Sequence, residues 1–240
     1  MAGLVPAIHV LPREKTWMPG AGNKEIEMKL AIIGAGDVGG TLGTAWARKG
    51  GHEIFFGVTN PRSDKTLALL KAIGGKARAG TAAEAAAFGD VIVLATPWHA
   101  TEAAIRSIGD LKGRIVIDCT NPLGMGPDGL GLAIGHDTSG GEKVQGWASG
   151  ASVFKALNTT GFKNMAGPVF GGVKSVMFVA GDDEANKPKV MALVGDLGFE
   201  MVDAGPLRIA RLLEPHAMLW IHLALNKGFG GDWGFALVRH

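Results

Sequence analysis

The sequence predicts an α/β fold: a doubly wound parallel sheet with a small C-terminal α/β extension. Short apolar runs rich in branched side chains recur along the chain, which is typical of strands buried in parallel sheets. Segments of good helix formers separate these runs, so strands and helices alternate. The chain has 240 residues, of which 47% are hydrophobic, and this is enough to bury a sizeable core.

The alternation begins at residue 28. The expected strands are 30–33, 53–57, 76–79, 90–95, 114–119, 153–157, 175–180 and 199–203. The expected helices are 41–49, 66–73, one opened by a capping box at Thr81 and Glu84, 101–108, 139–148, 183–197 and 207–225. Pro215 should kink or divide the last helix. Residues 124–135 are expected to form a glycine-rich loop.

Residues 1–27 stand apart from this pattern. They show neither helical nor strand periodicity, and they lack the continuous apolar core of a secretion signal. Met28 stands directly before the first strand, as a natural start would. We expect a non-domain extension without chemistry, and we favour sequence upstream of the true start over a disordered arm or a transit segment.

Residues 34–39, Gly-Ala-Gly-Asp-Val-Gly, follow the first strand and open a helix. In this context Gly34 would make a tight turn, Gly36 would let the backbone approach a pyrophosphate, and Gly39 would let the helix pack on the strand. The helix N-terminus would offer N–H groups to the phosphates. With 38 glycines in the chain, an ordinary glycine turn is the alternative. The predicted dinucleotide-binding residues here are Gly34, Ala35, Gly36, Asp37, Val38 and Gly39.

The turn after the second strand predicts which dinucleotide is preferred. An NAD site usually has an acidic residue there for the ribose 2′-hydroxyl, but none lies between Glu53 and Asp64. Thr59, Arg62 and Ser63 could instead hold a 2′-phosphate. The alternative is a solvated turn, because Asn-Pro is itself a turn signal. We therefore predict NADP(H).

Polar and aromatic residues follow three later strands where each ends, at the edge where open α/β sheets bind ligands. They are Thr96, Pro97 and Trp98 after strand 90–95, Asn121 and Pro122 after strand 114–119, and Asn158, Thr159 and Phe162 after strand 153–157.

Several absences narrow the chemistry. The chain has no Tyr to donate a proton and no His-x-x-x-His metal pattern, so we predict no metal. A net charge of +2 predicts neither nucleic acid nor membrane as a partner. His99 is the best candidate for an acid–base residue, whereas His52 is expected on the surface. These features favour hydride transfer between two rings, in which positioning supplies most of the catalysis and the partner is a small-molecule acceptor.

Cys119 is the only cysteine, which excludes an internal disulfide and suits a reducing cytoplasm. Because it ends an apolar run, we expect it to act as a small core hydrophobe.

Six motifs occur in order: 34–39, Thr96-Pro-Trp98, 118–123 (Asp-Cys-Thr-Asn-Pro-Leu), 155–159 (Lys-Ala-Leu-Asn-Thr), 203–207 (Asp-Ala-Gly-Pro-Leu) and 211–214 (Arg-Leu-Leu-Glu). Together they resemble the NADPH-dependent coenzyme F420 reductases, the F420-dependent NADP oxidoreductase family, over residues 28–239. The resemblance implies an NADP-binding Rossmann domain at 28–152, a small acceptor-binding part at 153–240, a deazaflavin pocket between them, and a homodimer.

Carried over by position, the resemblance implies that residues 34–39 hold the pyrophosphate and that Thr96 to Trp98 flank the ribose and nicotinamide. Asn121 and Pro122 would line the nicotinamide site, and Asn158 and Thr159 would face the deazaflavin. Bacterial relatives often have Arg at the position of Thr59, and archaeal relatives have His at the position of Asn158. The first departure bears on the NADP preference. The second bears on the acceptor, which is a deazaflavin or, failing that, a flavin.

Two other functions stay open at this point. One is reduction of a small carbonyl or imine, which a proton donor near the nicotinamide, with His99 as the candidate, would favour. The other is a non-catalytic NADP-binding redox sensor. An exposed apolar face on helix 207–225, with no cavity opposite Asn121, would favour it.

Overall fold

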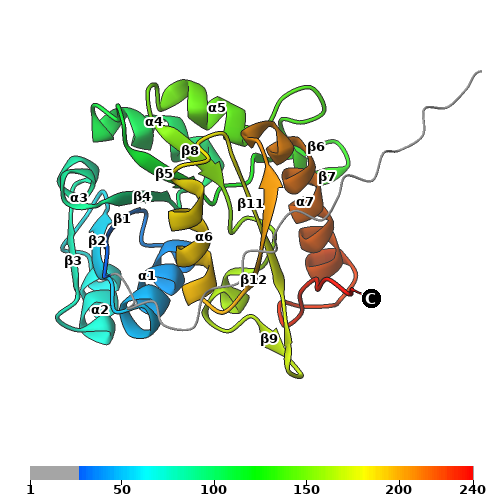
Figure 1. The fold of residues 1–240 in the computed structure, drawn as a ribbon, viewed down its shortest axis with the longest axis horizontal. Coiled ribbons are helices and arrows are strands. Elements are labelled where there is room, and N and C mark those ends of the chain that lie inside the picture. Colours follow the sequence, from blue (N-terminus) through cyan, green and yellow to red (C-terminus); the bar gives the residue numbers. More distant parts are fainter. Residues whose placement is uncertain (1–26, 240) are drawn as a thin grey trace, which may run out of the picture.

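The computed structural model describes residues 27–239, so the predicted N-terminal extension lies outside the described residues except for Glu27. Its centre is one eight-stranded sheet (Figure 1). In spatial order the strands are β12 (Glu200–Gly205), β11 (Val176–Gly181), β8 (Ser152–Lys155), β5 (Ile115–Asp118), β4 (Val91–Leu94), β1 (Lys29–Ile33), β2 (Glu53–Gly57) and β3 (Ala77–Gly80). The helices are α1 (Asp37–Lys49), α2 (Asp64–Ile73), α3 (Ala82–Phe88), α4 (Trp98–Ile108), α5 (Gly140–Trp147), α6 (Lys187–Asp196) and α7 (Ala210–Asn226).

Six neighbouring strands of this sheet, in the spatial order β8-β5-β4-β1-β2-β3, are parallel to one another. Helices cover both faces of the sheet. Leu30 and Ile32 of β1 enter the apolar cluster beneath α1 and α6, whereas Ala31 and Ile33 enter the cluster beneath α3, α4 and α5. Each central strand is therefore buried on both faces, which explains its continuous apolar sequence. This part confirms the predicted doubly wound α/β fold.

The last two strands correct the expectation of a wholly parallel sheet. β11 pairs antiparallel to β8 through Ala180 with Lys155 and Gly181 with Phe154, and β12 then pairs parallel to β11. A parallel connection usually carries a crossover helix. Between β8 and β11 the chain instead forms a short 3₁₀ turn, η1 (Phe162–Ala166), and a small hairpin of β9 (Val169–Phe170) and β10 (Val173–Lys174). None of these three elements was predicted.

The predicted glycine-rich loop at 124–135 is wrong, since the chain there forms a hairpin of β6 (Leu123–Gly126) and β7 (Gly129–Leu132). Gly129 has a φ of +100°, which suits glycine, and it follows Pro127 and Asp128 in a typical turn sequence. High glycine content conceals such a strand, because glycine has low strand propensity.

Several helix boundaries also differ from prediction. α1 begins at Asp37 and α4 at Trp98, earlier than expected, whereas α6 begins late because Asp183 accepts hydrogen bonds from the N–H groups of Ala185 and Asn186. The last helix is a 3₁₀ turn, η2 (Leu207–Ile209), followed by α7, which Pro215 does not divide.

His52 was predicted on the surface but is buried. Its Nδ1 accepts a hydrogen bond from the Met28 N–H at 3.1 Å, which leaves Nε2 to donate to Asp196, also at 3.1 Å. His52 therefore ties the start of β1 to α6.

Cys119 lies in the core, where burial raises the pKa of its thiol. None of the helices between residues 27 and 239 combines the length and the apolar sequence that a membrane crossing requires.

Candidate functional site

The glycine turn between β1 and α1 is built by close backbone packing. Gly34 has a φ of +105°, and a Cβ there would lie 2.7 Å from the Ala95 carbonyl oxygen. A Cβ on Gly39 would lie 2.0 Å from the Gly34 carbonyl oxygen. Both positions therefore require glycine, and Ala35 and Val38 pack against the core beside them.

Gly36 is different, because a Cβ there would meet no atom within 4 Å. It lies exposed at the N-cap of α1, and no side chain caps this helix. The first N–H groups of α1 are therefore available to an anion, and the positive end of the helix dipole adds to the attraction. The turn has the geometry that a pyrophosphate requires.

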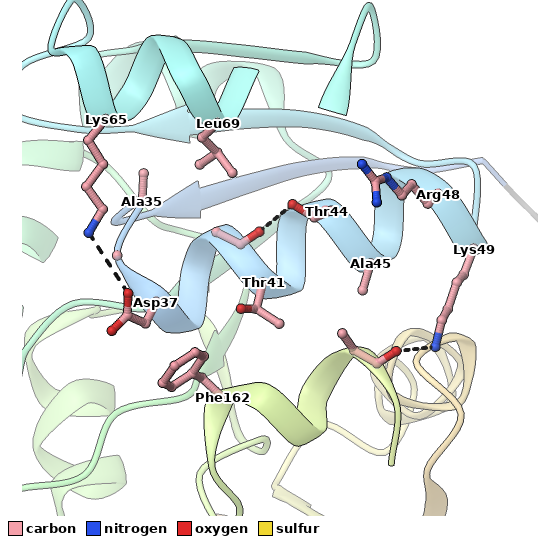
Figure 2. A pocket seen from close by; sticks show the side chains of 13 residues that line it. Ala35, Asp37, Thr41, Thr44, Ala45, Arg48, Lys49, Lys65, Leu69 and Phe162 are labelled. Atoms are coloured by element: carbon pink, nitrogen blue, oxygen red, sulfur yellow. Dashed lines mark hydrogen bonds and ion pairs between the residues drawn. The ribbon is translucent and has the colours of Figure 1, made fainter. Parts of the chain in front are cut away.

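A groove of about 550 Å³ runs from this turn along the outer face of α1 (Figure 2). Lys65 and Leu69 of α2 line one side, and Phe162 and Ala166 of η1 line the other. At the turn, Lys65 Nζ lies 4.0 Å from Asp37 Oδ1, and both side chains are well exposed. Phe162 was predicted in the acceptor pocket after β8. The structure places it on this groove, because η1 packs along α1.

The turn after β2 carries the residues predicted to select NADP(H). Thr59 and Arg62 are exposed, and the Arg62 N–H donates to Asn60 Oδ1 at 3.1 Å. Ser63 is the N-cap of α2, where its hydroxyl accepts from the Thr66 N–H at 3.3 Å. Sequence reasoning missed this capping role.

Within residues 27–239, no acidic side chain pairs with Arg62. Lys65, which sequence reasoning missed, is a cation that lines the groove beside the glycine turn. Lys65 directly precedes the predicted helix 66–73, and the structure places it in the first turn of α2. The two cations suit a phosphate.

A second and larger cavity, of about 1150 Å³, lies at the opposite edge of the sheet. Met28, Asp90 and Arg114 line it, and each directly precedes a parallel strand. Ligands of open α/β sheets bind at the carboxyl ends of strands. We therefore place the dinucleotide at the glycine turn and not in this cavity.

The residues after β4 form a tight helix start. Thr96 Oγ1 lies 2.9 Å from Thr101 Oγ1, and Pro97 occupies the N-cap position of α4. Trp98 packs its ring against Trp147 of α5, with ring centroids 5.3 Å apart. Trp98 thus joins α4 to α5, and its contact with the nicotinamide stays a prediction. His99 is exposed on the first turn of α4.

Asn121 and Asn158 come together across the ends of β5 and β8. Asn121 Nδ2 donates to the Asn158 carbonyl at 2.9 Å, and Asn158 Nδ2 donates to Asn121 Oδ1 at 3.1 Å and to the Leu213 carbonyl at 3.3 Å. The two backbone carbonyls fix the orientation of both amides. We refer to these two side chains as the amide pair.

The amide pair and the residue before Asn158 each have an energetically unfavourable feature. Leu157 has a φ of +64°, and Asn158 Oδ1 is buried without a hydrogen-bond partner among the described residues. Such features persist only where the surrounding structure enforces them. Thr159, the next residue, is buried, and its hydroxyl lies 3.5 Å from Met177 Sδ. Pro122 is buried beside Asn121.

A buried ionic cluster of Asp118, Lys155 and Glu214 adjoins the amide pair, because Asn158 Nδ2 donates to the carbonyl of the residue before Glu214. Lys155 Nζ lies 2.9 Å from Asp118 Oδ2 and 2.9 Å from Glu214 Oε1, and all three side chains are at most 1% exposed. Burial alone would lower the pKa of Lys155, but the two carboxylates outweigh burial and raise it. Sequence reasoning assigned the cluster no role. Its signal was a charged residue at the end of an apolar strand, in both β5 and β8.

The arrangement of these residues fits a dinucleotide. Among residues 27–239, no group of three or more His, Cys, Asp or Glu side chains could hold a metal ion. The open surface at Gly36, the uncapped start of α1 and the cations Arg62 and Lys65 fit a dinucleotide with a 2′-phosphate. The amide pair lies at the end of β5 and β8, on the other half of the sheet, where the second nucleotide half binds in this fold.

Comparison with known proteins identifies relatives of this chain. Residues 29–122 match the family described as NADP oxidoreductase, coenzyme F420-dependent. The F420-dependent NADP reductase of Methanocaldococcus jannaschii is 30% identical over 158 residues, which cover 61% of this chain and 69% of that protein. The protein of the same name from Methanothermobacter marburgensis is 26% identical over 83% of this chain and 94% of its own length.

Two solved structures extend the comparison. One from Arthrobacter sp. FB24, assigned to the F420-dependent NADP reductases, superposes with a TM-score of 0.81. It is 31% identical, over 88% of this chain and all of its own. A reductive aminase from Aspergillus terreus in complex with NADPH superposes with a TM-score of 0.62 at 20% identity, over 85% of this chain and 64% of its own, so it shares the fold. This protein is an NADP(H)-binding oxidoreductase, and it belongs to the family of coenzyme F420-dependent NADP oxidoreductases.

Proposed function

We propose that the protein transfers a hydride between NADP(H) and a deazaflavin of the coenzyme F420 type. The observation that carries this proposal is the chemistry at the ends of β5 and β8. The amide pair offers hydrogen-bonding groups there, whereas Asp118, Lys155 and Glu214 are buried and bonded to one another. Ring-to-ring hydride transfer needs positioning and no strong acid or base from the protein. The names of the archaeal relatives support the same acceptor.

In this proposal the chain's own residues bind and orient. The start of α1 holds the pyrophosphate, and Arg62 with Lys65 holds the 2′-phosphate. The amide pair, with Pro122, fixes the nicotinamide end against the acceptor, and Thr159 supports this region through β11. The bound dinucleotide supplies the hydride. In the same proposal, residues 28–152 form the NADP-binding domain and residues 153–240 form the acceptor-binding part.

The test is anaerobic stopped-flow mixing of the protein with NADPH and oxidised F420, with FMN in parallel. We expect fast bleaching of the deazaflavin and none of FMN. NADPH binding without transfer to either would reject the acceptor. A panel of small imines and carbonyls would then be tested with a His99→Ala variant, because His99 is exposed on the first turn of α4, just after β4.

We propose that the protein works as a homodimer. α7 exposes Leu212 and Leu219, which lie two turns apart on one face, and Leu225 near its end. The β6–β7 hairpin beside α7 exposes Met125. A second copy that packs on this surface would bury these side chains. Light scattering after gel filtration should give twice the mass of one chain, and Leu212→Lys with Leu219→Lys should give the monomer.

We place the reaction in the cytoplasm, where a lone buried thiol such as Cys119 stays reduced. The exposed face of α7 would also suit a redox sensor. Turnover with F420 separates the two functions, because a sensor would bind NADPH without transferring hydride.

A further inference from the structure

The charge on the buried ionic cluster can be counted from its hydrogen bonds. Asp118 Oδ1 accepts from the N–H and the hydroxyl of Thr120, and Oδ2 accepts from Lys155. Glu214 accepts from the N–H groups of Gly140 and Gly141 as well as from Lys155. All four carboxylate oxygens therefore face donors, so both acids are ionised beside one ammonium. The cluster has a net charge of −1.

The cluster contains one carboxylate more than is needed to neutralise the Lys155 ammonium. One carboxylate would neutralise Lys155, and a buried net charge is costly unless the structure compensates for it. Here the start of α5 compensates, because its first N–H groups point at Glu214. The fold therefore keeps a net negative charge inside the protein at this position and stabilises it with backbone N–H groups.

The position of this charge matters for the ligand. Asp118 and Lys155 end β5 and β8, the strands whose carboxyl ends carry the amide pair. Pro122 and the Glu214 carboxylate meet at Gly140: a Cβ there would lie 3.2 Å from Pro122 Cδ and 3.0 Å from Glu214 Oε1. The negative charge therefore lies under the nicotinamide half of the site, away from the glycine turn.

We propose that the Asp118–Lys155–Glu214 cluster makes the site bind the oxidised dinucleotide in preference to the reduced one, and thereby favours hydride donation by NADPH. When NADPH gives a hydride to an acceptor, its neutral dihydronicotinamide ring becomes a pyridinium with one positive charge. A fixed negative charge beneath the ring stabilises only the pyridinium. This role rests on the NADP(H) site and does not depend on the identity of the acceptor.

The magnitude follows from Coulomb's law. For charges separated by on the order of 10 Å, with an effective dielectric constant of about 20 to 40, removal of one charge changes an equilibrium constant by about 4- to 15-fold. The proposal therefore predicts that a variant with a neutral cluster loses about 4- to 15-fold more affinity for NADP⁺ than for NADPH. A purely structural cluster would change both affinities alike, because a loosened site weakens both ligands.

The experiment compares Glu214→Gln and Asp118→Asn, which neutralise the cluster from different elements and nearly preserve side-chain size. Asp203→Asn is the matched control, because Asp203 pairs with another buried lysine, Lys187, at 3.1 Å. Dissociation constants for NADP⁺ and NADPH are measured by calorimetry under anaerobic conditions, and melting temperatures show which variants fold. The two variants are expected to raise the ratio of the NADP⁺ constant to the NADPH constant, and the control to leave it unchanged.

An unchanged ratio in whichever of the two variants folds would overturn the proposal, whatever happens to the melting temperature. An equal change in the Asp203→Asn control would overturn it as well. If the unmodified protein bound neither form of the dinucleotide, the site itself would be wrong. If it bound both and failed only to reduce F420, the acceptor would be wrong and this inference would stand.

Discussion

Gly36 allows a substitution that should remove the dinucleotide and spare the fold. Its φ of −75° and ψ of −162° are extended and open to any residue, and a Cβ there meets nothing within 4 Å. In Gly36→Val, the lower entropy of the unfolded chain stabilises by about 0.4–1 kcal/mol. The poorer N-cap offsets this by an amount of the same order. We therefore expect a melting temperature within about 4 °C of the unmodified protein.

The affinity for NADPH should respond very differently. The valine side chain would occupy the space through which the pyrophosphate reaches the N–H groups of α1. A charge-assisted hydrogen bond contributes about 1.5–3 kcal/mol, so losing two of them should weaken binding by about 10²- to 10⁴-fold. Fluorescence titration with NADPH measures this. Gly75→Val is the control, because Gly75 is equally open and lies away from the turn. Unchanged NADPH affinity in Gly36→Val would refute the pyrophosphate assignment.

Three further predictions test other parts of the site and fold. Arg62→Ala should weaken NADPH more than NADH in the same titration, and equal losses would show that Arg62 does not contact the 2′-phosphate. Gly39→Ala should destabilise the fold by about 1–3 kcal/mol in urea unfolding, because its Cβ would lie 2.0 Å from the Gly34 carbonyl oxygen, and an unchanged midpoint would contradict this packing. The hydrogen bond from Arg211 lowers the pKa of Glu142 below 4.5, so its stabilisation is present at neutral pH and is lost as the pH falls through the lowered pKa. Glu142→Gln should therefore lose stability at pH 7 and progressively less as the pH is lowered through the pKa of Glu142, and a loss that does not change with pH would exclude the linkage.

The sequence predicted the first half of the fold well because local signals determine it. The run before Gly34, the turn and α1 follow one another along the chain, and close backbone packing requires the glycines at positions 34 and 39. The meeting of Asn121 and Asn158 was also predictable, because both follow adjacent parallel strands and therefore reach the same edge.

Features that depend on distant elements were not predictable. Glu214 reaches Lys155 only because α7 packs on α5, and no spacing in the sequence encodes that contact. Phe162 follows β8, yet η1 takes it to α1. His52 was misjudged because its partners, Met28 and Asp196, lie on separate elements and satisfy an otherwise unfavourable burial.

The glycine turn and the loop at 59–63 are separate modules, and this has a consequence for engineering the cofactor preference. The turn is fixed to the sheet by backbone contacts, whereas the loop is held by its own anchors: Asn60, which accepts from the Arg62 N–H, and Ser63, which caps α2. Thr59 and Arg62 project from these anchors into solvent. If Thr59 and Arg62 contact the 2′-phosphate as proposed, exchanging these two side chains together should redirect the protein between NADPH and NADH, with Asn60 and Ser63 retained and the glycine turn left untouched.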